Sequence, residues 1–89
     1  MRMRLKLRKA EILILGRDPE EIRLAKELLK QAILEVGPGI NYRVITDEEE
    51  ILSYGIAQTP AFILQEIEVK SQGYLPKVEV VREWIKDIT

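Results

Sequence analysis

The chain has 89 residues, with 14 basic and 15 acidic side chains, a net charge of −1, and neither cysteine nor histidine. The lack of both residue types excludes disulfides, thiol chemistry, zinc sites of the usual kind and imidazole acid–base catalysis. Hydrophobic residues at 46% and charged residues at 33% are typical of a small globular protein, so we expect a single domain over residues 1–89.

The first nine residues, MRMRLKLRK, alternate apolar and basic side chains, which indicates a strand with one basic face. From Ala10 the alternation stops, and the run AEILIL is nearly all apolar, as in a strand buried on both faces. We therefore predict an N-terminal arm or edge strand over residues 1–9, a bulge or bend, and then a central strand. The basic residues of the arm are Arg2, Arg4, Lys6, Arg8 and Lys9.

A helix is predicted directly after Gly16, which ends the central strand. Asp18 suits the N-cap, Pro19 suits the first helical position, and Glu21 stands three residues after Asp18 as in a capping box. Apolar residues then recur at helical spacing until Gly37-Pro38-Gly39 stops the helix. The predicted buried stripe contains Ile22, Ala25, Leu29, Ala32, Ile33 and Val36, widened by Leu24 and Leu28.

Residues 40–45 are predicted to form a second strand, and residues 46–50 to open a short helix that Gly55 ends. Thr46 and Glu49 stand in capping-box register at the start of this helix. The acidic run over residues 47–50 could suggest a divalent-metal site, but calcium sites need ligands spaced along a loop. We therefore predict a solvated helix N-terminus and no metal.

Residues 61–64 and 67–71 predict a third and a fourth strand, close enough to form a hairpin. A last helix follows Pro76, and its apolar face contains Val78, Val81, Trp84, Ile85 and Ile88. The order is β-α-β-α-β-β-α, which predicts an α/β protein with a four-stranded mixed sheet flanked by three helices. The first two strands should be parallel, joined by a right-handed crossover.

The segment YGIAQTPAF over residues 54–62 interrupts an apolar run with Thr59-Pro60. A proline inside a strand would lose a ladder hydrogen bond, so Pro60 belongs at the strand entry. A bond before proline adopts the cis form at a cost of only ~0.5–1 kcal/mol. We predict that the Thr59–Pro60 bond is cis and that the backbone of Thr59 faces outward near the start of the first helix. A trans turn is the alternative.

From Ala10 onward the chain resembles the thioredoxin-like family in its small, glutaredoxin-sized form. The resemblance lies in the strand AEILILG, the helix opening DPEEI, the segment YGIAQTPAF and the closing LPKVEVVREWI. It implies a cis-proline at Thr59-Pro60, next to which that family pairs an extended peptide or thiol substrate by strand addition. Aligned on Gly16, the family's Cys-x-x-Cys pair would fall near Pro19 and Ile22. Neither is cysteine, so we predict no thiol–disulfide exchange.

Acidic residues occupy the place of the cysteine pair. Asp18, Glu20 and Glu21 either cap the helix or form part of a site for a basic or neutral peptide, and the sequence leaves both readings open. Trp84 lies on the apolar stripe of the last helix and is predicted to be core. Tyr54 is predicted to be an exposed contact residue.

We expect a redox-inactive peptide- or protein-binding module with no catalytic residue and no cofactor. The predicted peptide-binding residues are Asp18, Glu21, Tyr54, Gln58, Thr59 and Pro60. One alternative is a regulatory assembly protein, because the segment GRDPEEIRLAKELLKQAI resembles the helix opening of the KaiB clock proteins. Another is an enzyme that uses carboxylates or a bound small molecule on the same fold.

The basic arm offers a further alternative, nucleic-acid binding through phosphates. The net charge and the lack of interleaved aromatic residues argue against it. The arm has an apolar face, formed by Met1, Met3, Leu5 and Leu7, that should be buried against another apolar surface. We therefore expect residues 1–7 to contribute to a homodimer interface. The sequence does not identify any other protein or peptide partner.

No apolar run approaches the ~20 residues of a membrane helix, and no apolar signal core follows the basic start, so we expect a cytoplasmic protein without a membrane segment. The charge-rich, cysteine-free composition resembles that of thermophilic proteins.

Overall fold

The computed structural model describes residues 11–65 and 67–88, so the predicted N-terminal arm and Ala10 lie outside the described residues. The elements follow the predicted order: β1 (Glu11–Leu15), α1 (Pro19–Val36), β2 (Asn41–Ile45), α2 (Glu48–Ser53), β3 (Ala61–Leu64), β4 (Glu68–Gln72) and α3 (Val78–Ile88). Two strands differ from their predicted bounds by one residue. β2 begins at Asn41 because Ile40 still belongs to the turn after α1, in which its N–H donates to the carbonyl of Gly37, and β4 covers residues 68–72 instead of 67–71.

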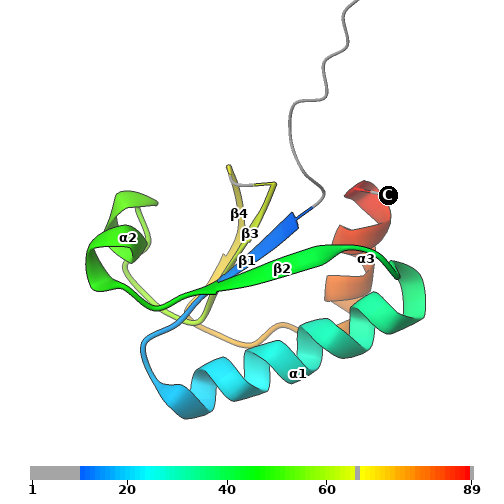
Figure 1. Ribbon diagram of the computed structural model, residues 1–89, viewed down its shortest axis with the longest axis horizontal. Coiled ribbons are helices and arrows are strands. Elements are labelled where there is room, and N and C mark those ends of the chain that lie inside the picture. The colour runs from blue at the N-terminus through cyan, green and yellow to red at the C-terminus, as the bar shows by residue number, and fades with distance from the viewer. Residues whose placement is uncertain (1–10, 66, 89) are drawn as a thin grey trace, which may run out of the picture.

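The four strands form one mixed sheet in the order β2-β1-β3-β4 (Figure 1). β2 runs parallel to β1, as the predicted crossover requires, while β3 is antiparallel to both β1 and β4. The pairing of β3 with β4 shifts register, since Phe62 pairs with Ser71 and Ile63 pairs with Val69. Lys70 is therefore left over as a bulge in β4.

Helices cover both faces of the sheet, with α1 and α3 on one side and the short α2 on the other (Figure 1). Alternate strand residues point to opposite faces, so the buried strands β1 and β3 supply side chains to both layers. The α1–α3 layer is centred on Phe62, whose ring lies 5.7 Å from that of Trp84 at a tilt of 53°. The prediction that Trp84 belongs to the core is thus confirmed. The second layer contains Leu13, Leu15, Ile45, Ile51, Ile56, Ala61 and Ile63.

Helix α1 begins with the predicted capping box. The Asp18 carboxylate accepts from the backbone N–H groups of Glu20 and Glu21, each at 3.0 Å, and the Glu21 carboxylate accepts from the N–H of Asp18 at 3.3 Å. These contacts satisfy N–H groups that the helix itself cannot pair. Leu24 was predicted to widen the buried stripe, but this is wrong, because its position beside the stripe leaves it 37% exposed.

Helix α2 does not begin as predicted. Its N-cap is Asp47 and not Thr46, since the Asp47 carboxylate accepts from the N–H of Glu50 at 3.0 Å. The prediction misplaced the cap by one residue because both types are good N-caps.

The Thr59–Pro60 peptide bond is cis, as predicted, and it leads directly into β3. In the part of the chain that the structure describes, no helix is long and apolar enough to cross a membrane.

Candidate functional site

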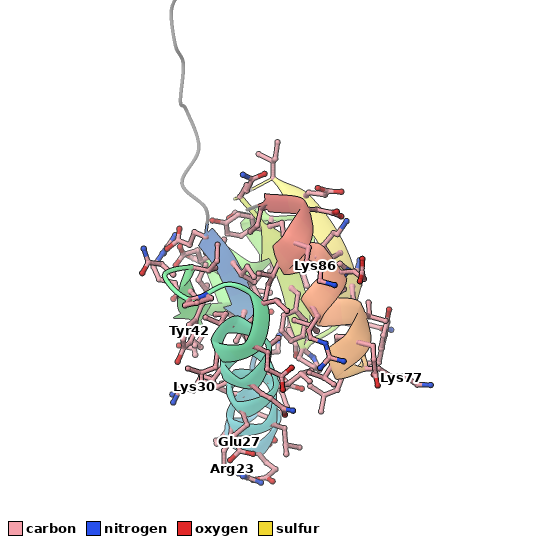
Figure 2. The ribbon with its side chains drawn as sticks, turned by 90° about the vertical axis from the view of Figure 1, so that its right-hand side faces the viewer. Arg23, Glu27, Lys30, Tyr42, Lys77 and Lys86 are labelled. Carbon is pink, nitrogen blue, oxygen red and sulfur yellow. The ribbon has the colours of Figure 1, made fainter. Side chains whose placement is uncertain are left out.

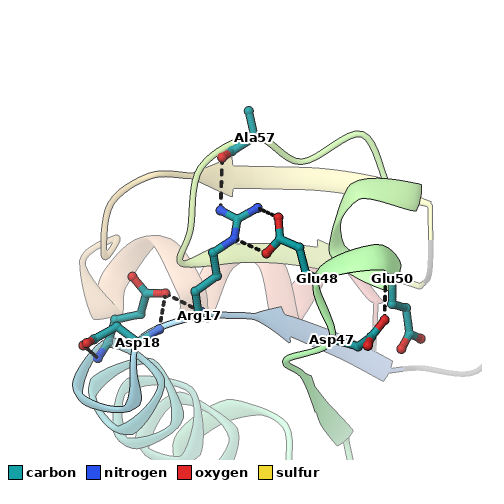
Figure 3. Close-up of polar contacts among 7 residues, drawn as sticks. Arg17, Asp18, Asp47, Glu48, Glu50 and Ala57 are labelled. Carbon is teal, nitrogen blue, oxygen red and sulfur yellow. Dashed lines mark hydrogen bonds and ion pairs between the residues drawn. The ribbon is translucent and has the colours of Figure 1, made fainter.

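The loop before Pro60 is tied to both helix N-termini by Arg17. The guanidinium donates from Nε and Nη2 to the two carboxylate oxygens of Glu48, at 2.7 and 3.0 Å, and from Nη1 to the carbonyl of Ala57 at 3.1 Å (Figure 3). A planar guanidinium can form such a paired contact with a carboxylate and still reach a third acceptor. Arg17 therefore joins the start of α1, the start of α2 and the loop that leads to Pro60.

A second contact joins the loop to α1, between Glu21 and the side chain of Thr59. Partial burial opposes ionisation of Glu21, but hydrogen bonds from the Thr59 side chain and from the N–H groups of Arg17 and Asp18, together with the Arg17 charge, outweigh it. The pKa of the Glu21 carboxyl is consequently held below its usual value. The capping carboxylate of α1 thus also holds the residue that precedes the cis-proline.

This contact predicts a pH dependence of stability. A carboxyl whose pKa is lowered by folding stabilises the folded state above its unfolded pKa of about 4.3, and the contribution is lost as the pH falls through the folded pKa. We expect Glu21→Gln, which can keep the capping box, to reduce the loss of stability between pH 6 and pH 3 in urea denaturation. Thr59→Val should reduce it in part. If both variants lose as much stability between pH 6 and pH 3 as the unchanged protein does, folding does not lower the pKa of the Glu21 carboxyl.

The backbone of Thr59 has no backbone hydrogen-bond partner among the described residues. Within residues 11–65 and 67–88, neither its N–H nor its C=O hydrogen-bonds to another backbone group. The neighbouring groups are engaged: the Pro60 carbonyl accepts from the N–H of Gly73 at 2.9 Å, and the N–H of Ala57 donates to the Gln72 side chain at 3.3 Å. The loop is therefore anchored on both sides of a free pair of backbone groups.

The segment after β4 lies directly against this loop. A Cβ atom on Gly73 would fall 2.5 Å from Oε1 of Gln58, and the φ of Gly73 is +91°, a conformation that favours glycine. Tyr74 and Leu75, which follow, are 56% and 40% exposed. Two large apolar side chains thus stand exposed directly after the turn glycine, and neither was among the predicted peptide-binding residues.

The predicted site residues differ in how far their side chains are exposed to solvent. Gln58 and Asp18 are exposed, and Thr59 and Glu21 are half-buried and in contact with each other. Pro60 is buried. Tyr54 is half-buried and packs against the core layer under α2, so the prediction that it is an exposed contact residue is wrong. Its place at the end of α2 turns the ring inward beside the buried Ile51 and Ile56 of that layer.

Two further carboxyl groups at the helix N-termini, those of Glu20 in α1 and Glu48 in α2, are held in the ionised form. Hydrogen bonds from Arg23 and from Arg17 lower the pKa of Glu20 and of Glu48, respectively. A general acid needs a raised carboxyl pKa, so neither of these groups is suited to that role. In the described ranges, no three carboxylates converge in a way that could hold a metal ion.

The sequence model of the protein family described as "Thioredoxin domain" matches residues 11–86. The match covers every strand and nearly all of α3, and it includes the Arg17 contacts, Glu21 and the loop with the cis bond. Neither the curated proteins nor the solved structures yield a match to the chain.

Proposed function

We propose, for a chain that belongs to the thioredoxin domain family and contains no cysteine, a redox-inactive role in which the Thr59–Pro60 loop binds an extended peptide or a segment of a partner protein. The observation that carries the proposal is the free N–H and C=O of Thr59 on a loop that Arg17 and Glu21 hold in place. Backbone groups fixed in this way can pair with an incoming extended chain at little entropic cost.

The surroundings of the loop favour a basic or neutral peptide with an apolar side chain. Asp18, Glu20 and Glu21 give the adjoining start of α1 a negative charge, which repels anionic ligands and attracts cations. Tyr74 and Leu75 add exposed apolar surface beyond Gly73. A tyrosine at such a place can supply contact area and a hydrogen bond at a small cost in conformational entropy.

The same proposal predicts that the chain does not reduce disulfides. The sequence contains no thiol that could attack a disulfide sulfur. In an insulin-reduction assay with dithiothreitol, the rate with the protein should equal the rate without it. A clear acceleration of insulin precipitation would contradict the redox-inactive role.

Peptide selection is the direct test of the binding role. We expect random linear peptides displayed on phage to yield ligands for the immobilised chain, and we expect the selected peptides to shift the amide NMR signals of Gln58, Thr59 and Gly73. The double substitution Tyr74→Ala and Leu75→Ala should weaken their binding at least about tenfold, as for contact residues at the centre of an interface. Leu34→Ala, which removes a leucine on α1 that is 78% exposed, is the matched control.

Two results would refute the binding role. One is amide shifts that occur elsewhere on the molecule, and the other is equal affinity of the double variant and the control. Failure of the selection to enrich any peptide over the uncoated support would count against it as well.

A homodimer remains our proposal for residues 1–7, which lie outside the described residues. Its support is the alternating sequence MRMRLKL, since a strand with one apolar face is an association site. Sedimentation equilibrium should give a dimer for the full chain and a monomer for a variant that begins at Lys9. Two monomers at micromolar concentration would exclude the dimer.

A further inference from the structure

A second surface, unrelated to the Thr59–Pro60 loop, lies along α1. An open groove of about 260 Å³ is lined by Pro19, Ile22, Arg23, Lys26, Glu27 and Lys30. Arg23 is engaged there, since it forms ion pairs with Glu20 and Glu27. Lys26 and Lys30 form no ion pair with any residue of the described ranges. The groove therefore carries two unneutralised positive charges one helical turn apart.

The helical rotation places this groove beside β2. Ala25 and Leu29 are buried against the sheet, and Glu35 pairs with Arg82 of α3, which marks the α3 side of the helix. At about 100° per residue, Lys26 and Lys30 fall on the opposite side from Glu35. That side faces the sheet edge formed by β2, and Lys30 and Tyr42 indeed lie on the same side of the molecule in Figure 2.

The outer edge of β2 has unused backbone groups. The carbonyl of Ile45 accepts from the N–H of Gly16 at the end of β1, so the groups of Ile45, and of Arg43 two residues before it, point toward β1. The N–H and C=O groups of Tyr42 and Val44 therefore point away from the sheet. Among the described strands, β2 pairs with β1 alone.

The other edge of the sheet is less suited to strand addition. β4 carries the bulge at Lys70, and an ion pair joins Lys70 to Glu68 across its length. Bulges and charged pairs are the devices by which edge strands avoid pairing with other chains. β2 pairs with β1 in an unbroken register over all five of its residues and has no bulge, and its one charged residue, Arg43, forms an ion pair with Glu11 of β1.

We propose that the outer edge of β2 binds an acidic, extended segment of a partner protein as a fifth strand, with carboxylates at alternate positions in contact with Lys26 and Lys30. The spacing fits, since four helical residues rise about 6 Å and two strand residues rise about 6.6 Å. Side chains at alternate positions of the added strand point to one face of the sheet, which here is the face covered by α1.

The positive charge of the groove favours an acidic segment over a basic one. An added strand that carries lysine or arginine at alternate positions would place like charges beside Lys26 and Lys30, which is unfavourable. The segment MRMRLKLRK of this chain has that unfavourable pattern when its basic side chains face α1, and in the other orientation it sets apolar side chains against the two lysines. A second copy of the chain could also add its own β2 antiparallel to this edge. If that pairing were centred on Arg43, the two Arg43 residues would stand opposite each other and their like charges would repel. An acidic partner segment meets neither obstacle.

The experiment uses two fluorescein-labelled nine-residue peptides, one alternating glutamate with threonine and one alternating lysine with threonine. In fluorescence anisotropy at low salt, the glutamate peptide should bind the full chain and the lysine peptide should bind at least about tenfold more weakly. The double substitution Lys26→Glu and Lys30→Glu should weaken the binding of the glutamate peptide by at least about tenfold. The matched control, Lys77→Glu with Lys86→Glu, reverses one charge directly before α3 and one on α3 (Figure 2), and it should leave the affinity for the glutamate peptide within about threefold.

A second measurement separates strand addition from simple charge attraction. A glutamate peptide N-methylated along one edge keeps its charge but cannot pair through that edge, so it should lose at least about tenfold in affinity. The unmodified peptide should shift the amide signals of Tyr42 and Val44. The proposal would be overturned if the methylated peptide bound as tightly as the unmodified one. It would also be overturned if both protein variants lost the same affinity for the glutamate peptide, or if the amide shifts were centred on Thr59.

Discussion

Phe62→Ala is expected to remove about 3–5 kcal/mol from the free energy of unfolding, which is most of the stability of a protein this small. Phe62 is fully buried in β3, in the middle of the sheet, and its ring packs against Trp84 of α3. Its loss leaves a cavity between the sheet and both large helices, and the surrounding strands cannot close it without moving. Urea denaturation followed by far-UV circular dichroism measures the effect.

The control for this prediction is again Leu34→Ala, which should change the free energy of unfolding by less than about 0.5 kcal/mol. If Phe62→Ala costs less than about 1 kcal/mol, the packing described for the α1–α3 layer is incorrect. A variant that fails to fold would agree with the prediction. Phe62→Leu, which keeps most of the volume, should then fold with a smaller loss.

Gly37→Ala is expected to cost about 1–3 kcal/mol, the usual cost of forcing an extra methyl group into a packed core. The φ of Gly37 is −147°, which lies outside the left-handed region that favours glycine, so the expected cost is argued from close contact. A Cβ atom there would lie 2.3 Å from Cγ2 of Ile85 and 3.0 Å from Cγ1 of Ile40. Ile85 is fully buried on α3, and a β-branched side chain has few rotamers with which to yield.

A double-mutant cycle identifies the clash. Ile85→Leu removes the branch at Cβ and with it the atom nearest to the added methyl group. In that background Gly37→Ala should cost distinctly less than it does in the natural sequence, again measured by urea denaturation. Additive costs would indicate that Gly37 is needed for a reason other than close contact with α3.

The sequence was sufficient to predict every described strand and helix because local signals agreed with the tertiary fold. The apolar run of β1, the Asp18 capping box and the Thr59-Pro60 pair each act within a few residues, and each is confirmed. The mixed four-stranded sheet followed from their order, and the family followed from the resemblance of these segments to thioredoxin-like proteins. The boundaries of β2 and β4 were less certain because single hydrogen bonds decide them.

The contacts that build the candidate site could not be predicted in the same way. Arg17 meets Glu48 and Ala57, which lie 31 and 40 residues further along the chain, and nothing in the local sequence points to either. Tyr54 was misplaced because exposure at the end of a short helix depends on how that helix is rotated over the sheet. The bulge at Lys70 also has no turn or glycine signal in the sequence.

The burial of the single tryptophan, Trp84, has a spectroscopic consequence. Its indole lies at the contact between α3 and the sheet, so its fluorescence emission should shift to longer wavelength only when α3 separates from the sheet. Both proposed binding surfaces contain a tyrosine and no tryptophan: Tyr74 beside the Thr59–Pro60 loop and Tyr42 on β2. Excitation at 295 nm should therefore follow unfolding alone, and a tyrosine-free peptide that binds at either surface should change tyrosine emission while leaving the tryptophan spectrum as it is.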